Sequence, residues 1–295
     1  MVVNQQALRL IFTGFKTIFA KAFDNSKTLW DKVATLVPSE TREEAYTWLG
    51  MLPKMREWIG DRQIKNLEAS DYTIKNEPFE LTIGVPRDDI EDDRLGIYTP
   101  VIQSMGQSTA THPDELVFGL LKTGFENHCY DKKPFFCDQH KVGKKIFSNK
   151  GTAKLSLESY IAARTAMMSL TDESGNPLKI VPDLLVVPPS LEAKAREILL
   201  ADQINGTTNT MKGTAEPLVV PDLAGKDDAW YLLCVNRPIK PLIYQLRKAP
   251  QFVAKNQETD DNMFFGREAI YGVDSRENAG YGLWQMAYGS DGSGS

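Results

Sequence analysis

Two of the three histidines and two of the three cysteines in this chain lie within one short stretch. They are His128, Cys129, Cys137 and His140. Imidazole and thiolate are preferred zinc ligands, so this stretch is the first candidate for chemistry. Structural zinc sites usually pair ligands at C-x2-4-C or H-x3-5-H spacing, and only Cys137 and His140 lie at such a distance. We therefore predict no metal, and expect a buried cysteine and a hydrogen-bonded histidine instead.

A second group of chemically capable residues is an acidic cluster, which consists of Asp88, Asp89, Glu91, Asp92 and Asp93. Asp89 and Asp93 would share a helical face at i and i+4, a spacing that could hold Mg2+ or Ca2+. The glycine turn and terminal glutamate of a calcium loop are missing. The cluster is flanked by Arg56, Arg62, Arg87 and Arg94. The pattern therefore favours an ion-pair network, either solvated or between subunits.

The motifs of common enzyme classes are missing from the sequence. There is no Walker loop, G-x-S-x-G elbow or H-E-x-x-H pair, and the G-x-G run at Gly280 has no helix pattern behind it. A catalytic site needs a nucleophile, a base and a group that orients the base. The sequence therefore predicts no enzyme, no catalytic residue and no cofactor. The alternative from this class is a metal-dependent hydrolase that uses the acidic cluster or the His/Cys stretch.

The elements that would position these residues begin with an amphipathic helix between Ala7 and Phe23. Its apolar residues recur at helical spacing and include Phe12, Phe15 and Phe19. This stripe needs cover, either from the chain's own core or from another subunit, with a membrane surface as the third alternative. Charged residues interrupt the segment, and it is too short to span a bilayer. Neither a signal peptide nor a membrane span is predicted.

Alternating apolar residues between Asp61 and Arg87 predict a long β-hairpin that turns near Asn76. The apolar positions of its arms are Tyr72, Ile74, Phe79, Leu81 and Ile83. Arms of about 13 residues would reach ~40 Å, against a radius of gyration near ~19 Å for a compact chain of this length. A two-stranded ribbon is marginal alone, so its apolar face needs cover from its own domain or from a neighbouring copy. Its length favours the neighbour.

Helical patterns resume after the acidic cluster, from Leu95 to Met105 and again up to Phe125. Pro113 lies between them, and proline either starts a helix or marks a kink. We expect one long, bent helix.

The second half of the chain alternates helices with strands and then becomes mostly β. A helix at Leu157–Met168, a strand at Asp183–Val187 and a helix ending near Leu200 predict a compact α+β module. Further strands are predicted at Leu218–Pro221, Trp230–Val235, Leu242–Leu246, Met263–Val273 and Leu283–Ala287. The final residues, Gly289 to Ser295, are interpreted as a flexible tail or an expression remnant.

The composition is that of an acidic globular chain. It has 295 residues, of which 42% are hydrophobic and 25% charged, with a formal net charge of -5 and three cysteines. A dedicated nucleic-acid binder needs a basic face, so this class is disfavoured. Three cysteines cannot complete a disulfide framework, and we predict no bridge and a reducing cytosol.

Several blocks of the sequence resemble the major head subunits of Mu-like phages and prophages. In order, they are Tyr46-Thr-Trp48-Leu-Gly50, Pro53 to Arg62, Asp88 to Asp93 with Leu95-Gly96, His112 to Leu116, Cys129-Tyr130-Asp131, Phe135-Phe136 with His140, and Pro182 to Pro189. They cover most of the chain, and their shared order makes the resemblance specific. In the family pattern a small or acidic residue precedes the Asp-x-His block, whereas this chain has Cys137 there. The difference counts against a metal-binding role of this stretch that the family would share.

The resemblance implies an α+β fold, the Hong Kong 97-type major capsid fold, and a structural function. Its parts would be an N-terminal arm (1–55), an extended β-hairpin loop (56–91), a peripheral domain with a long spine helix (92–155 and 237–295) and an axial domain (156–236). Copies would form pentamers, hexamers and an icosahedral shell that encloses double-stranded DNA without sequence-specific binding. Implied partners are the portal, scaffold/protease and head-completion proteins of the same phage, and no membrane. Assembly would occur in the host bacterial cytoplasm, and the product would be the virion capsid.

Subunit contacts are predicted at the phenylalanine stripe, the hairpin and the acidic cluster. The residues are Phe12, Phe15, Phe19, Tyr72, Ile74, Phe79, Leu81, Ile83, Arg56, Arg62, Asp89 and Asp92. The alternative structural function is a ring component of a phage tail or connector. Such a protein would stop at a single ring, so particle size distinguishes it from a shell protein. Some proteins of this fold cross-link lysine to asparagine. The hairpin contains Lys65, Lys75 and Asn76, but no activating acid is apparent, so no cross-link is predicted.

Overall fold

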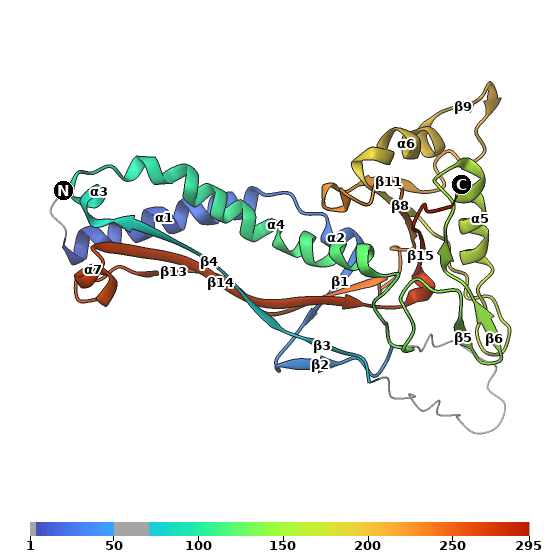
Figure 1. Cartoon of the computed structure of the whole chain (residues 1–295), viewed down its shortest axis with the longest axis horizontal. Coiled ribbons are helices and arrows are strands. Elements are labelled where there is room, and N and C mark those ends of the chain that lie inside the picture. Colours follow the sequence, from blue (N-terminus) through green and yellow to red (C-terminus); the bar gives the residue numbers. More distant parts are fainter. Residues whose placement is uncertain (1–3, 50–70, 295) are drawn as a thin grey trace.

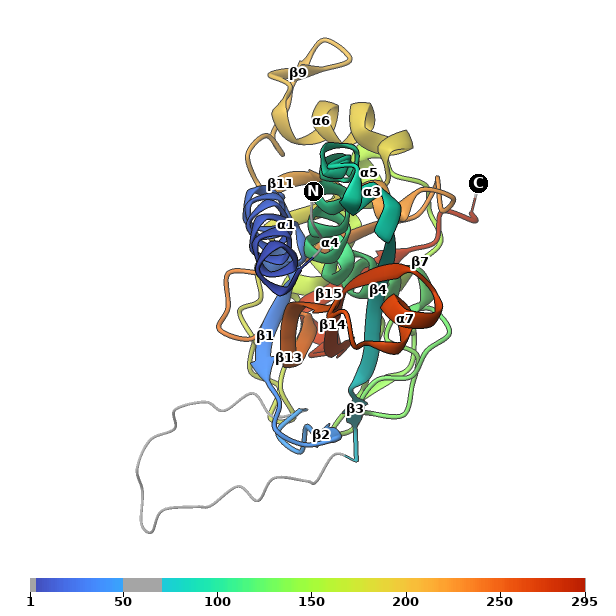
Figure 2. The ribbon, with the colours of Figure 1, turned by 90° about the vertical axis from the view of Figure 1, so that its left-hand side faces the viewer.

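The computed structural model describes residues 4–49 and 71–294. Within them, two long helices, α1 (Gln5–Asn25) and α4 (Thr99–Thr123), lie along one face of a four-stranded sheet (Figures 1 and 2). The strand order is β1-β13-β14-β4. These strands are β1 (Ala34–Pro38), β13 (Leu242–Lys255), β14 (Glu268–Tyr281) and β4 (Glu77–Pro86). Helices and sheet together make an elongated domain.

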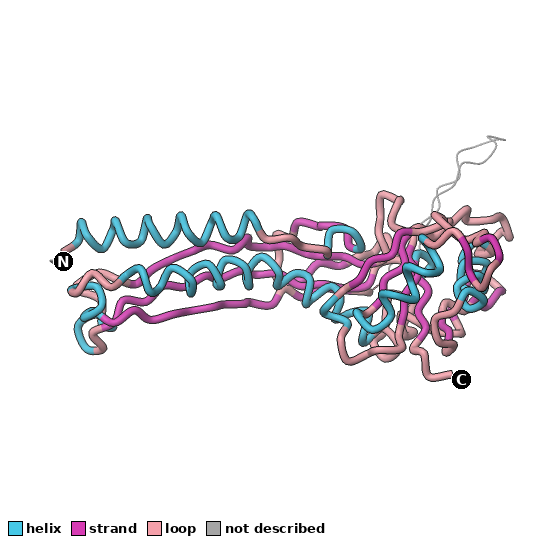
Figure 3. Tube along the Cα trace, turned by 90° about the horizontal axis from the view of Figure 1, so that it is seen from above, coloured by secondary structure: helices cyan, strands magenta, loops and turns pink. Residues whose placement is uncertain are grey.

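A second, more compact domain lies at one end of the elongated domain (Figure 3). Its five-stranded sheet has the order β11-β8-β12-β15-β7. The strands are β7 (Lys150–Gly151), β8 (Leu184–Val187), β11 (Glu216–Val219), β12 (Trp230–Leu233) and β15 (Ala287–Ser290). Helix α5 (Leu157–Met168) packs on β15, and α6 (Glu192–Leu200) packs on β8 and β11. The fold is thus α+β, as predicted.

Shorter elements connect these parts. The helical ones are α2 (Trp30–Val33), α3 (Arg87–Glu91), α7 (Asp261–Phe265), η1 (Leu95–Tyr98), η2 (Pro189–Leu191), η3 (Pro221–Leu223) and η4 (Trp284–Met286). In the part of the chain that the structure describes, three two-stranded pairs are formed by β2 (Glu43–Ala45) with β3 (Thr73–Lys75), β5 (His140–Val142) with β6 (Lys145–Phe147), and β9 (Gln203–Ile204) with β10 (Thr207–Thr208).

Local sequence signals set several helix boundaries. The Asn4 side chain accepts a hydrogen bond from the Ala7 N–H at 2.9 Å and starts α1. Ser156 caps α5, because its hydroxyl accepts from the Ser159 N–H while the Ser159 hydroxyl accepts from the Ser156 N–H. The predicted bounds of α5 are confirmed. Among the described residues, no helix is both long enough and apolar enough to cross a bilayer.

The aromatic stripe of α1 is covered by the chain's own core. Phe15 meets Tyr271 edge to face with ring centroids 5.0 Å apart, and the Phe19 ring lies 5.1 Å from Phe252. Phe15 is only 4% exposed and Phe19 only 6%. Phe12 is half-buried and stacks on Phe252. The stripe is therefore covered by the chain's own core, the first of the three predicted alternatives. Phe15 and Phe19 are too deeply buried to contact another copy.

The predicted hairpin that turns near Asn76 is wrong. Strand β3 pairs with β2, whereas β4 pairs with β14 along its whole length and forms one edge of the sheet. Only Asn76 separates β3 from β4, which leaves no residues for a hairpin turn. An alternating pattern reports that one face of a strand is covered, but not which partner covers it. The remaining part of the predicted hairpin, residues 61–70, lies outside the described residues.

The C-terminal region differs from its prediction in two places. Met263 begins no strand, because Asp261–Phe265 is α7, and most of the predicted strand at 283–287 is η4. The expected flexible tail is packed as far as Gly294, which donates to the Thr152 carbonyl. At Gly289 a Cβ atom would lie 2.8 Å from the Phe136 ring, so glycine here permits close packing rather than flexibility.

Candidate functional site

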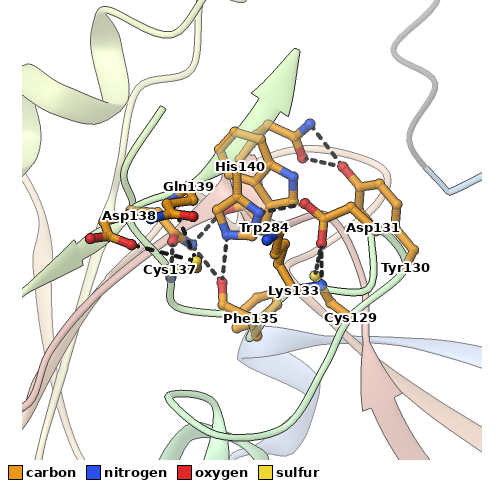
Figure 4. Close-up of polar contacts among 12 residues, drawn as sticks. Cys129, Tyr130, Asp131, Lys133, Phe135, Cys137, Asp138, Gln139, His140 and Trp284 are labelled. Atoms are coloured by element: carbon orange, nitrogen blue, oxygen red, sulfur yellow. Dashed lines mark hydrogen bonds and ion pairs between the residues drawn. The ribbon is translucent and has the colours of Figure 1, made fainter. Parts of the chain in front are cut away.

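The His/Cys stretch forms a buried polar cluster, but not with the four predicted members (Figure 4). His140 Nδ1 lies 2.6 Å from Asp131 Oδ2, and the Cys129 thiol donates to Asp131 Oδ1 at 3.2 Å. Their ligand atoms lie within 4.8 Å of one another, close enough to hold a metal ion. Cys137 Sγ instead accepts from the Gln139 N–H. Sequence reasoning missed Asp131, although it stands two residues after Cys129.

The polar atoms of this cluster already satisfy one another. Both His140 nitrogens face oxygen acceptors, since Nε2 lies 3.3 Å from the Phe135 carbonyl. The His140 ring also stacks on Trp284, with ring centroids 4.1 Å apart. Burial tends to raise the pKa of Asp131, but the hydrogen bond and charge of His140 lower it overall. The cluster contains the expected buried cysteine and hydrogen-bonded histidine, and it ties the 129–140 loop to the C-terminal segment.

A second buried cluster fixes the ends of β2 and β3. The Tyr46 hydroxyl donates to Gln245 Oε1 at 2.7 Å, and Gln245 Nε2 donates to Asn76 Oδ1 at 2.8 Å and to the Ile74 carbonyl at 3.0 Å. Asn76 Nδ2 in turn donates to Ser39 Oγ at 2.8 Å. Gln245 and Asn76 are at most 1% exposed. This "β2–β3 network" joins the ends of β2 and β3 to β13.

The predicted hairpin contacts are mostly covered within the chain. Ile74 is buried, and the Tyr72 hydroxyl accepts from the Tyr281 N–H at 2.7 Å. Phe79 meets the His112 ring edge to face at 4.3 Å, and Ile83 packs against the core beneath α1. Leu81 is 36% exposed, so it remains available to a neighbour.

The acidic cluster forms the predicted ion-pair network, and the described part of the network lies within one chain. Asp88 pairs with Arg267 at 2.6 Å, Glu91 with Arg87 at 2.8 Å and Asp89 with Arg94 at 3.5 Å. Asp89 also accepts from the Tyr98 hydroxyl, whereas Asp92 is exposed. Arg56 and Arg62 lie outside the described residues.

Within residues 4–49 and 71–294, the most exposed aromatic side chains lie where the sequence predicted a strand. Phe264 is 72% exposed and Phe265 is 79% exposed, both on α7 at the end of the elongated domain (Figure 1). Their rings contact each other edge to face at 4.9 Å. Sequence reasoning assigned this apolar pair to a strand, because apolarity alone reports neither the element nor its exposure.

One carboxylate is buried between α4 and the sheet. Glu277 is 1% exposed, and its Oε1 accepts from the Ser275 hydroxyl at 3.2 Å and lies 3.9 Å from His112 Nε2. Its Oε2 makes no well-formed hydrogen bond among the described residues, although the Tyr244 hydroxyl lies near the carboxyl. Burial raises the pKa of Glu277, although the charge of His112 and the Tyr244 hydroxyl act against this.

We expect Glu277→Gln to raise the free energy of unfolding at pH 8 by about 1–3 kcal/mol, because a neutral amide replaces a buried carboxylate whose charge the core compensates only in part. The folded-state pKa lies above the ordinary 4.5, so native Glu277 costs stability once pH exceeds that value. The gain should therefore vanish at pH 4. Urea denaturation at both pH values measures it, with exposed Glu80→Gln as the control. A variant no more stable than the native chain at pH 8 would contradict this account.

Comparison with known proteins gives consistent matches over nearly the whole chain. The family described as "Mu-like prophage major head subunit gpT" matches at residues 8–154, 146–223 and 222–293. The major capsid protein of Escherichia phage Mu is 33% identical over 287 residues, which is 97% of this chain and 74% of that protein. The Mu-like prophage FluMu major head subunit of Haemophilus influenzae is 32% identical over 97% of this chain and 73% of its own length. Among solved structures, a chain of the procapsid of bacteriophage JBD30 is 36% identical, with a TM-score of 0.63. The match covers 98% of this chain and 76% of the JBD30 chain.

Proposed function

The chain belongs to the family of Mu-like prophage major head subunits, and we propose that its copies join by noncovalent contacts into pentamers and hexamers of an icosahedral head. It is a structural capsid protein of the virion with the Hong Kong 97-type fold, and not an enzyme. It self-assembles into the capsid. The observation that carries the proposal is the match over 97% of the chain to a major capsid protein.

The two domains suit the parts that such a subunit needs. The elongated domain is assigned as the peripheral domain with α4 as its spine helix, and the compact domain as the axial domain. Because β7 and β15 pair into the five-stranded sheet, the axial domain gains residues 150–151 and 287–290 beyond the predicted 156–236. In the N-terminal arm, α1 lies on the peripheral domain. The assignment of 56–70 to an extended loop lies outside the described residues, and 77–86 belongs to β4.

The proposal also covers the enclosed DNA, the partner proteins of the shell and the place of assembly. The head encloses double-stranded DNA without sequence-specific binding. A net charge of -5 on each chain disfavours strong electrostatic binding to the DNA phosphates. The portal, scaffold/protease and head-completion proteins of the same phage are the assigned partners, and assembly takes place in the host bacterial cytoplasm. Each contact between copies can be modest, because closure of a shell multiplies it.

Sedimentation velocity of the purified chain, alone and after co-expression with the other head proteins of its phage, tests the proposed assembly. We expect a fast-sedimenting species far larger than one ring, because contacts between identical copies continue until the shell closes. A species that stops at one ring would favour the tail or connector alternative. A monomer under both conditions, at high protein concentration, would contradict shell formation.

A further inference from the structure

The distal end of the elongated domain is an aromatic knob. We define the "distal knob" as α7 with its flanking residues, Gln257 to Arg267. Met263 is 1% exposed and anchors α7, while Asn262 Nδ2 donates to the carbonyls of Lys255 and Glu268 and so joins the two strands that α7 connects. A buried anchor and a clamped turn hold Phe264 and Phe265 outward. These two rings are therefore presented by a fixed support, and an exposed pair of this kind marks a contact site.

The knob is also acidic. Glu258 and Asp261 are exposed, and neither takes part in an ion pair among the residues that the structure describes. Arg267, the basic residue of the knob, is already paired with Asp88. Two identical knobs would therefore bring uncompensated carboxylates together, which costs free energy. The partner surface should be apolar at its centre and basic at its rim.

Such a surface lies on the outer face of α1. The hollow there is shallow and open, and all of its lining residues belong to α1: the half-buried Phe12, Thr13, Thr17 and Ala20, with Lys16, Lys21, Asp24 and Asn25. Lys16 and Lys21 are exposed, and Lys16 Nζ lies 6.0 Å from the centre of the Phe12 ring. Lysines beside an aromatic ring and small side chains complement a knob of two phenylalanines and two carboxylates.

We propose that the distal knob of one copy docks into the α1 hollow of a second copy, with Phe264 and Phe265 at the centre and Glu258 and Asp261 facing Lys16 and Lys21. The two surfaces differ, so the contact is head-to-tail and can close into a ring of its own. The inference rests on the proposed function, because it assigns one of the contacts that a shell requires. The knob is the end of the peripheral domain farthest from the axial domain (Figure 1), so the contact joins neighbouring capsomers rather than subunits of one capsomer.

The small area of the knob limits the strength of this contact. Two phenylalanines bury roughly 300–400 Å2 on the knob side, while a specific stable interface usually buries about 1,200 Å2 or more in total. One knob therefore cannot hold two isolated copies together, and its effect appears only when many contacts close at once.

The test is a charge-swap cycle read by electron microscopy and sedimentation. We expect Phe264→Ser with Phe265→Ser to abolish closed shells and leave capsomer-sized rings. Lys16→Glu with Lys21→Glu, or Glu258→Lys with Asp261→Lys, should do the same. The four charge substitutions combined should restore shells, which a folding defect could not explain.

The outcomes separate this contact from the proposed function. Normal shells from the serine variant, or failure of the combined charge variant to recover them while its circular dichroism stays native, would overturn the docking proposal. Absence of shells from the native chain with its head proteins would instead count against the proposed function itself.

Discussion

Substitution of Gln245 by leucine is expected to lower the free energy of unfolding by about 4 kcal/mol. The Gln245 amide is fully buried and bonds to Tyr46, Asn76 and the Ile74 carbonyl. Leucine would fill the space but leave the buried Tyr46 hydroxyl and Asn76 Oδ1 without their Gln245 partner, and the Ile74 carbonyl, which also lies in the β2–β3 ladder, would lose one donor. Each unsatisfied buried group costs about 1–3 kcal/mol before relaxation. Urea denaturation measures the loss, and hydrogen exchange at Asn76 N–H, which donates to the Arg42 carbonyl, reports where it acts.

Gln285→Leu is the matched control for this prediction. Gln285 is also buried at 5% exposure, but its amide has Tyr130 as its partner, at 3.0–3.1 Å. We expect a loss of about 1 kcal/mol there. Equal losses at the two glutamines would show that the β2–β3 network adds nothing beyond an ordinary buried amide, and that the base of β2 and β3 is held by other contacts.

The second large effect is expected at the crossing of α1 and α4. At Gly106 a Cβ atom would lie 2.6 Å from the Phe19 carbonyl oxygen and 2.9 Å from the Ala22 Cβ. Backbone cannot yield as a flexible side chain can, so Gly106→Ala must push α1 away from α4 and loosen Phe15 and Phe19. We expect a loss of about 3 kcal/mol, at the upper end for overpacking. Faster tryptic cleavage after Lys16 and Lys21 would locate the loss in α1.

Gly119 offers a control on the same helix. A Cβ atom there meets nothing within 4 Å, and alanine lowers the entropy lost on folding. Gly119→Ala should therefore stabilise the chain by about 0.5–1 kcal/mol, the opposite sign. If both alanine variants gained stability, the tight crossing of the two helices would be refuted.

Local signals in the sequence were sufficient where a boundary depends on near neighbours. The cap at Ser156 fixed the start of α5, and the apolar run at 184–187 gave β8, buried at every position. The family resemblance likewise rested on ordered blocks of residues. Such features depend on residues close in sequence, which a single chain displays directly.

Long-range features were not predictable in this way. The alternation in 77–86 was real, but its partner β14 lies nearly 200 residues away in the sequence. Asp131 joined Cys129 and His140 only because the loop folds back on itself. The outward display of Phe264 and Phe265 depends on the buried Met263 and on the clamp at Asn262, both of which are tertiary facts.

Cryo-electron microscopy of particles purified from cells that express the chain with its head proteins tests the central claim, that this subunit completes its surface with copies of itself. We predict closed icosahedral particles whose pentamers and hexamers are made of this chain. Preparations that contain only isolated rings or single chains would contradict it.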